Sequence, residues 1–258
     1  MLKDFKIEKR NTKVFIIKTK NKVIKIPYTF NSWKEIQKER VVIGEIREDI
    51  GFSPHLLEYK YIFGCPITAR LSPIKEADNG LVEKYFQKAF ADSEKWEKRP
   101  LRYLLDSDFF LNFVLKHIPD SYNRLVKFLD AVRIPQSSSH SDFHQKNILK
   151  KVDRLYFIDW MRYKGNSSKY FDLLDFYIYQ KGKKYEPWME AWSREYNQIS
   201  DAIFGVKISK EYFLAYAAWR VSEELKKFAL ENALDKYKYK KYVNFINILN
   251  EKINVHLF

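Results

Sequence analysis

The sequence of 258 residues predicts an α+β protein, in which a small antiparallel β-sheet is followed by a larger, mainly helical part. Charged residues alternate with β-branched or aromatic residues in three short runs over the first 27 residues, which is typical of strands with one buried face. Beyond residue 80, most segments carry apolar residues three and four positions apart, as amphipathic helices do. An apolar content of 46% is enough for one large core or two small ones.

The N-terminal part is expected to be a compact lobe of residues 1–71. Asn-containing breaks between the first three runs favour antiparallel hairpins. A helix is expected to begin with Ser32 as its N-cap and to end before Gly51. Strands of a five-stranded sheet are predicted at 5–9, 13–19, 22–27, 55–63 and 65–71.

Residues 71–80 contain proline, glycine and other turn formers, so a second lobe of residues 72–258 is expected to follow them. One stretch of it, 135–160, does not look helical, because a turn-rich loop leads there into two short apolar runs that predict a β-hairpin, 148–149 and 155–158. Helices are predicted at 81–90, 102–117, 122–132, 171–179, 188–202, 210–232 and 237–257.

The glycine and cysteine contents exclude several kinds of site. The seven glycines are placed so that neither G-x-x-x-x-G-K-S/T nor G-x-G-x-x-G can be written, which excludes a P-loop and an ordinary dinucleotide fingerprint. Cys65 is the only cysteine, so no internal disulfide or thiolate-rich zinc site can form, and a reducing, cytoplasmic compartment is expected. The N-terminus lacks an apolar core and the longest apolar stretch is interrupted by Asn112, so we expect neither a signal peptide nor a membrane span.

Polar residues with metal-binding and acid–base chemistry gather in one part of the chain. A carboxylate at the end of a strand and an Asp with an Asn on a neighbouring loop can supply oxygen ligands to Mg²⁺. A second carboxylate, free of the metal, can hold a hydroxyl group as it attacks phosphorus. The residues are His140, Asp142, His144, Lys146 and Asn147 on the predicted loop, and Asp159 after the run LYFI.

This segment resembles the aminoglycoside phosphotransferase and choline kinase-like family, which has a two-lobed protein-kinase-like fold. HSDFHQKNIL is similar to the family's Brenner-type motif H-G-D-x-H-x-x-N-I-L, and FIDW is similar to its metal-binding I-D-W segment. The resemblance implies that Asp142 is the catalytic base, that Asn147 and Asp159 bind Mg²⁺, and that His140 braces the loop. It also implies that Asp172 accepts hydrogen bonds from the catalytic loop, a role for which Asp175 competes.

The same resemblance requires a lysine at the end of the third strand and a glutamate on the following helix, paired to hold the α and β phosphates of the nucleotide. Lys25 and Glu39 meet both requirements. Their close competitors are Lys22, Lys34 and Glu35. Further phosphate contacts are expected from Asn11 or Thr12 in the first hairpin, and His144 and Lys146 could either touch the γ-phosphate or face water.

These residues together predict an ATP- or GTP-dependent, Mg²⁺-dependent phosphotransferase that acts on a hydroxyl of a small molecule or a sugar or glycan. Two alternatives remain at this point. The chain could bind nucleotide without turnover, as a pseudokinase. It could also be a metal-dependent hydrolase, because His140, Asp142 and His144 alternate along the chain and could share a metal with Asp159.

The net charge bears on the partners. Lys and Arg number 47 against 33 Asp and Glu, a formal charge of +14, which favours an anionic acceptor over polycationic aminoglycosides. Met161 and Arg162 follow I-D-W, and this arrangement resembles that of lipopolysaccharide sugar kinases more than that of the antibiotic-resistance members of the family. The basic run 234–249 could contact an anionic membrane surface, although a solvated helix face is favoured and no specific nucleic-acid partner is expected. The only local acidic cluster that could receive a cationic acceptor is Asp172, Asp175, Glu186 and Glu190.

Overall fold

The computed structural model describes all residues except 1–5, 10–12, 183–185, 200, 231–235 and 258. The chain divides into two compact units, each formed by two separate segments. The first unit comprises residues 1–85 and 140–163, and the second comprises residues 86–139 and 164–258. Both units combine helices with antiparallel strands, which agrees with the predicted α+β class.

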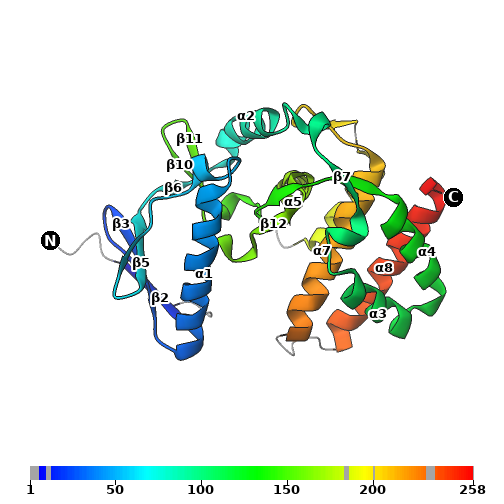
Figure 1. Cartoon of the computed structure of the whole chain (residues 1–258), viewed down its shortest axis with the longest axis horizontal. Coiled ribbons are helices and arrows are strands. Elements are labelled where there is room, and N and C mark those ends of the chain that lie inside the picture. The colour runs from blue at the N-terminus through cyan, green and yellow to red at the C-terminus, as the bar shows by residue number, and fades with distance from the viewer. Residues whose placement is uncertain (1–5, 10–12, 183–185, 200, 231–235, 258) are drawn as a thin grey trace. The chain divides into compact units, whose positions relative to one another are not determined.

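The first unit contains the predicted antiparallel sheet of five strands, in the order β1-β2-β3-β5-β4 (Figure 1). The turn between β4 and β5 has positive φ at both central residues, Phe63 and Gly64, as in a two-residue hairpin with right-handed twist. Gly64 also meets the indole of Trp33, which leaves no room for a side chain. The strands are β1 (Lys6–Lys9), β2 (Val14–Lys18), β3 (Lys22–Pro27), β4 (Lys60–Ile62) and β5 (Cys65–Ala69).

Helix α1 (Phe30–Glu48) packs against this sheet (Figure 1). Its N-cap is Thr29, whose side chain accepts a hydrogen bond from the Ser32 backbone, while Ser32 completes the capping box. The prediction of Ser32 as N-cap was therefore wrong by one helical turn, because the helix begins as soon as the chain leaves the strand that Pro27 ends. One face of α1 is buried; its residues are Ser32, Ile36, Glu39, Ile43 and Ile46.

The segment with the polar cluster belongs to the first unit rather than to the helical one. Strand β10 (Ile148–Lys151) pairs with β11 (Arg154–Phe157) as the predicted hairpin, and on its other edge with β6 (Ser72–Pro73). Leu56 forms a bridge with Phe157, and a short turn after β11, η6 (Trp160–Arg162), contacts α1. These long-range pairings place residues 72–85 and 140–163 with the sheet, which differs from the expected division at residue 71.

The second unit is mainly helical, as predicted. The residue at the centre of its core is Trp219, which is fully buried and stacks on Phe171 with ring centroids 4.8 Å apart. Helix α6 ends at Tyr196, six residues before the predicted end at 202. Its helices are α3 (Ser107–His117), α4 (Pro119–Ala131), α5 (Lys169–Lys181), α6 (Trp188–Tyr196), α7 (Lys210–Leu230) and α8 (Lys236–Leu257), and α2 (Asn79–Ala89) is shared with the first unit.

Short strands and 3₁₀ turns connect these helices. Two of the pairings, β7 with β8 and β9 with β12, join segments that are distant in the sequence. The strands are β7 (Lys98–Pro100), β8 (Arg133–Pro135), β9 (Ser137–Ser139), β12 (Lys164–Ser167), β13 (Ala202–Ile203) and β14 (Val206–Lys207). Among the described helices of the chain, none combines the length and the apolar composition that crossing a membrane requires.

Candidate active site

The loop that contains the motif residues begins at His140, which is fully buried in the first unit. Its imidazole stands 4.5 Å from the Trp160 ring, and its Nε2 lies 2.9 Å from the carbonyl oxygen of Ile158. Burial lowers the pKa of His140 to about 4, so the ring is neutral and donates from Nε2 to that carbonyl. This bond joins the start of the loop to the backbone next to Asp159 and so restrains the loop relative to the end of β11.

Asp142 is held by Asn147. The Asn147 amide nitrogen Nδ2 donates to the backbone carbonyl of Asp142 at 2.9 Å and to its carboxylate Oδ2 at 3.1 Å. Asn147 is buried and ends a 3₁₀ turn, η5 (Gln145–Asn147). The side chain of Asp142 is 22% exposed, so its carboxylate is oriented by the protein and still reachable from solvent.

His144 is the N-cap of η5 and also faces Asp142. Its Nδ1 accepts a hydrogen bond from the backbone N–H of Lys146 at 3.2 Å, and its Nε2 lies 3.7 Å from Asp142 Oδ2. The same Nε2 lies 3.3 Å from the amide nitrogen Nδ2 of Asn147. The Lys146 side chain is exposed.

Asp159 lies beside Asn147 at the open end of the hairpin. The backbone N–H of Ile158, the residue before Asp159, donates to the carbonyl of Asn147 at 3.0 Å. The backbones of Asn147 and Asp159 are therefore close together. Asp159 has a left-handed backbone, with φ of 66°, which aspartate tolerates better than most residues. Its charge, like that of Asp142, stabilises a proton on His140.

The donor atoms at this place fit Mg²⁺. Asp159 is exposed and offers a carboxylate, and Asn147 offers its amide oxygen because Nδ2 is already committed to Asp142. Carboxylate and amide oxygens are the ligands that this hard cation prefers.

Lys25 and Glu39 form an ion pair in the same unit. Lys25 lies in β3 and Glu39 on the buried face of α1, with Lys25 Nζ 2.7 Å and 2.9 Å from the two carboxylate oxygens. Glu39 is 4% exposed, and a carboxylate at that depth needs such a partner. The competing residues Lys22, Lys34 and Glu35 are all exposed.

The charges of Glu39 and Asp159 both act on one buried phenol, that of Tyr59. The pKa of Tyr59 lies well above its usual value, first because the side chain is buried and second because the charges of Glu39 and Asp159 disfavour a phenolate. Both carboxylates are therefore within electrostatic reach of Tyr59. The first unit thus brings the lysine, the glutamate and the motif residues of the loop into one compact body.

Two expected residues of the second unit have partners there. Asp172 is buried on α5 and accepts a hydrogen bond from Ser139 Oγ at 2.8 Å, immediately before the loop in sequence. Asp175 accepts from the Tyr216 hydroxyl at 2.9 Å and pairs with Arg220 at 3.1 Å. Asn11 and Thr12, expected to touch phosphate, lie outside the described residues.

The geometry does not favour the alternative hydrolase site. His140 turns its Nε2 to the Ile158 carbonyl instead of toward Asp142 and His144. Within the described parts of the chain, no group of three or more His, Cys, Asp or Glu residues is arranged to hold a metal. The candidate set for Mg²⁺ is different in kind, since it consists of one amide and one carboxylate and leaves positions for phosphate oxygens and water.

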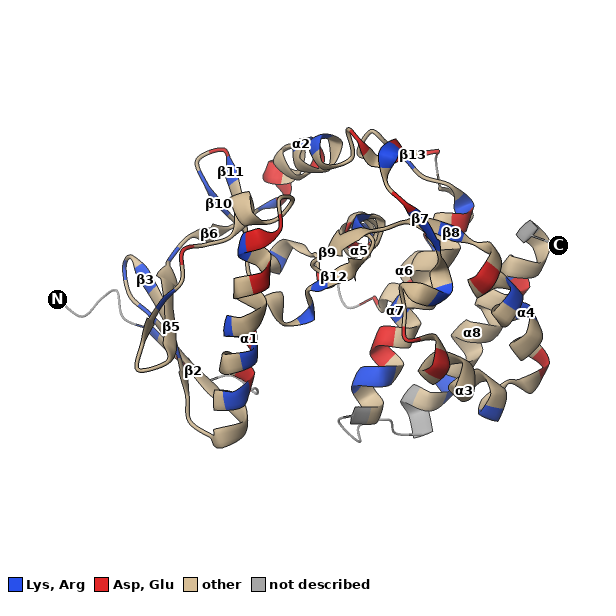
Figure 2. Cartoon of the chain, in the orientation of Figure 1, with Lys and Arg blue, Asp and Glu red and all other residues tan. Residues whose placement is uncertain are grey.

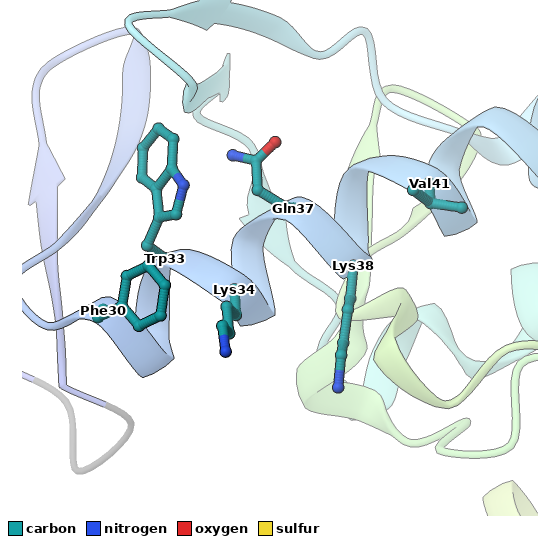
Figure 3. A pocket seen from close by; sticks show the side chains of 6 residues that line it. All are labelled: Phe30, Trp33, Lys34, Gln37, Lys38 and Val41. Atoms are coloured by element: carbon teal, nitrogen blue, oxygen red, sulfur yellow. The ribbon is translucent and has the colours of Figure 1, made fainter.

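A groove on the outer side of α1 is separate from these residues. Figure 3 shows its apolar end, formed by Phe30 and Trp33, and two lysines, Lys34 and Lys38, that extend from the same side of the helix. Gln37 and Val41 complete the lining. Lys34, a competitor for the role of Lys25, lies in it, whereas Lys25, Glu39 and the motif residues of the loop do not.

Solved structures with a similar fold include a choline kinase and antibiotic phosphotransferases. A choline kinase from Streptococcus pneumoniae has 16% sequence identity and a TM-score of 0.55, covering 97% of this chain and 95% of that chain. A macrolide 2'-phosphotransferase from Brachybacterium faecium has 11% identity and a TM-score of 0.56, covering 96% and 93%. A thermostable mutant of an aminoglycoside phosphotransferase, in ternary complex with ADP and hygromycin B, has 11% identity and a TM-score of 0.57, covering 96% and 94%.

The chain has the protein-kinase-like fold of these phosphotransferases. The comparison confirms the fold that the motif HSDFHQKNIL implied. The sequence itself matches no protein-family model and no curated protein. Within a protein-kinase-like fold, the first unit corresponds to the expected sheet with its helix, together with the loop that carries Asp142.

Proposed function

We propose that this protein is a phosphotransferase that moves the γ-phosphoryl group of ATP or GTP to a hydroxyl of a small molecule, sugar or glycan. The observation that carries the proposal is the hydrogen-bonded pair of Asp142 and Asn147, next to Asp159 and in the same unit as the Lys25–Glu39 ion pair. Each of these groups meets one requirement of phosphoryl transfer, which depends mainly on positioning and on neutralising charge.

Asp142 is the residue that receives the acceptor. Its carboxylate accepts a hydrogen bond from the acceptor hydroxyl and takes the proton as the oxygen bonds to the γ-phosphorus, while the bond from phosphorus to the β–γ bridging oxygen breaks and the nucleoside diphosphate leaves. Asn147 prevents the carboxylate from rotating, because it bonds both the backbone and the side chain of Asp142. His140 fixes the start of the loop through the Ile158 carbonyl.

Asn147 and Asp159 are the residues that would hold Mg²⁺. When bound there, the ion supplies charge neutralisation for the phosphate oxygens. Lys25 holds the α and β phosphates, and Glu39 keeps the Lys25 ammonium in one position through its two short contacts. His144 and Lys146 are adjacent to Asp142 on the loop and are candidates for contacts to the γ-phosphate.

Nucleotide binding is supported by two of the similar structures, one containing ADP and another described as a GDP complex. Both nucleotides therefore belong in the first assays. A peripheral contact with an anionic membrane, which the net charge of +14 and the basic run before and within α8 suggest, is a separate expectation. Vesicle sedimentation of the intact protein tests it.

The proposal is tested by transfer of labelled phosphate from ATP and from GTP to a panel of sugars, amino alcohols and glycan fragments. Transfer by the wild type should require Mg²⁺ and should fall by at least about 100-fold in Asp142→Asn, since general-base assistance contributes on this order. Nucleotide binding without transfer to any acceptor or to water would indicate a pseudokinase. Loss of a phosphate ester from a substrate without nucleotide would indicate a hydrolase.

A further inference from the structure

Arg162 lies next to Asp142. The family motif assigns no role to an arginine at this position. Arg162 ends η6, and its Nη1 is 3.7 Å from Asp142 Oδ1. At that distance the two charges attract each other, but the contact is too long for a hydrogen bond. In the parts of the chain that the structure describes, the guanidinium makes no hydrogen bond, and its side chain is 31% exposed.

Other arginines of the protein are used differently. Arg220 touches Asp175 at 3.1 Å and Glu224 at 3.3 Å, and its side chain is 14% exposed. Arg70 donates to the Thr19 carbonyl at 2.8 Å. An arginine has five N–H donors in a planar fork that matches a carboxylate or a phosphate. Arg162 therefore offers a fork that the described residues leave open.

The two carboxylate oxygens of Asp142 contact different residues. Oδ2 faces Asn147, the candidate metal ligand, at 3.1 Å. Oδ1 faces Arg162 instead. Asn147 and Arg162 therefore contact different oxygens of the same carboxylate, and the guanidinium lies next to any group that binds at Oδ1.

Three of the four acidic residues that could have received a cationic acceptor have other partners. Asp175 is paired with Arg220, Glu186 with Arg194, and Asp172 accepts from Ser139. Glu190 is exposed. Figure 2 shows the Asp and Glu residues, in red, spread over many elements together with Lys and Arg, in blue. The candidate cluster is thus built into the packing of the second unit, whereas the charge beside Asp142 is positive.

We propose that Arg162 binds a phosphate or carboxylate group of the acceptor, next to the hydroxyl that Asp142 activates. The inference rests on the proposed function and deepens it, because it names one residue that selects an anionic substrate class. The guanidinium forms a bidentate contact with the anionic group, because its 3.7 Å contact with Asp142 commits none of its N–H donors. The γ-phosphate of the nucleotide is the competing anion, and the experiment separates the two.

The experiment compares matched acceptors that differ in one anionic group. Glycerol is paired with glycerol 3-phosphate, and glucose with glucose 6-phosphate and with glucuronate, at saturating MgATP. The variants are Arg162→Gln, which removes the charge, Arg162→Lys, which keeps the charge without the fork, and Lys151→Gln as control. Lys151 is an exposed lysine at the turn of the β10–β11 hairpin, so its replacement lowers the net charge equally without changing the surroundings of Asp142.

We expect the wild type to phosphorylate an anionic member of a pair with the higher kcat/KM. In Arg162→Gln the ratio of anionic to neutral kcat/KM should fall by about 10- to 100-fold, the effect of losing a charged hydrogen-bonding partner. The ratio for Arg162→Lys should lie between those of the wild type and Arg162→Gln, and the ratio for Lys151→Gln should match that of the wild type. The Kd of MgADP and the thermal unfolding midpoint should stay at the wild-type values in all three variants.

Three results overturn the inference. The first is a panel in which no anionic member is a better substrate than its neutral partner. The second is an equal loss for both members in Arg162→Gln, which assigns the guanidinium to the γ-phosphate. The third is an unchanged ratio. Failure of the proposed function looks different, since Asp142→Asn would then keep the wild-type rate of transfer or the wild type would not bind MgADP.

Discussion

Asn147 donates from one amide nitrogen to both the backbone carbonyl and the carboxylate of Asp142, at 2.9 Å and 3.1 Å. A single buried side chain therefore orients the carboxylate through its Nδ2, and its amide oxygen takes no part in that contact. In the proposed function these are two tasks, orientation of the residue that receives the hydroxyl and provision of a magnesium ligand. Both are open to direct measurement.

Asn147→Ala should remove both tasks. We expect the Mg²⁺ concentration for half-maximal phosphoryl transfer to rise by about 10- to 100-fold, as when metal-orienting groups are lost. Magnesium titration of the labelled-phosphate assay measures it. Gln145→Ala is the control, because Gln145 lies in the same 3₁₀ turn and its side chain points to Asn79 at 3.4 Å. An equal rise in both variants would contradict the assignment.

Glu39→Gln should weaken nucleotide binding. The neutral amide cannot hold the Lys25 ammonium at 2.7 Å as the carboxylate does, so Lys25 becomes mobile and we expect the Kd of MgADP to rise by about tenfold, the order of one lost charge-assisted hydrogen bond. Titration calorimetry gives the Kd. Glu35→Gln, at an exposed position of the same helix, should leave it unchanged. A Kd that does not change in Glu39→Gln would separate the ion pair from nucleotide binding.

His140 should make the stability of the fold depend on pH. Its pKa is about 4 in the folded chain, because burial disfavours the charged ring, whereas the ordinary value is 6.5. Between these values the unfolded chain binds more protons, so the stabilisation is complete above pH 6.5 and is lost as the pH falls toward 4. The loss between pH 6.5 and pH 5 should be about 2 kcal/mol.

Urea unfolding at several pH values measures this loss. In His140→Gln the free energy of unfolding should be lower throughout, because the bond to Ile158 is altered, but it should vary less between pH 6.5 and pH 5. The slope, rather than the absolute stability, is the test. Equal slopes in the variant and the wild type would show that other groups cause the dependence.

Val152 should be replaceable with a gain in stability. It lies at the turn of the β10–β11 hairpin with φ of 54°, which is strained for a β-branched residue, and its side chain is 82% exposed. We expect Val152→Gly to raise the free energy of unfolding by about 1 kcal/mol. Val255 is similarly exposed but helical, so Val255→Gly should lower it, by roughly 0.3–0.5 kcal/mol. Chemical denaturation distinguishes a gain from a loss.

Local sequence pattern was sufficient for much of the fold. Alternation predicted the first three strands within a residue or so, and the family resemblance selected Glu39, which the structure places on the buried face of a helix. A buried carboxylate needs a cation nearby, and β3 supplies Lys25. The N-cap was misplaced because Thr29 and Ser32 are both good capping residues and only the path of the chain decides between them.

Long-range pairing is what the sequence did not reveal. The pairing of β10 with β6 moves the whole loop of Asp142 into the unit of the sheet, although about 75 residues separate the two strands. The same limit applies to Arg162, which no periodicity distinguishes from other surface arginines. Its significance comes from a distance to Asp142 that depends on the left-handed turn at Asp159.

Transfer of labelled γ-phosphate to a hydroxyl acceptor, measured for the wild type and for Asp142→Asn under the same conditions, tests the central claim most directly. The account predicts Mg²⁺-dependent formation of a phosphate ester by the wild type and at least about 100-fold slower formation by the variant, which still binds MgADP. Equal rates for the two proteins, or product formed without nucleotide, would contradict it.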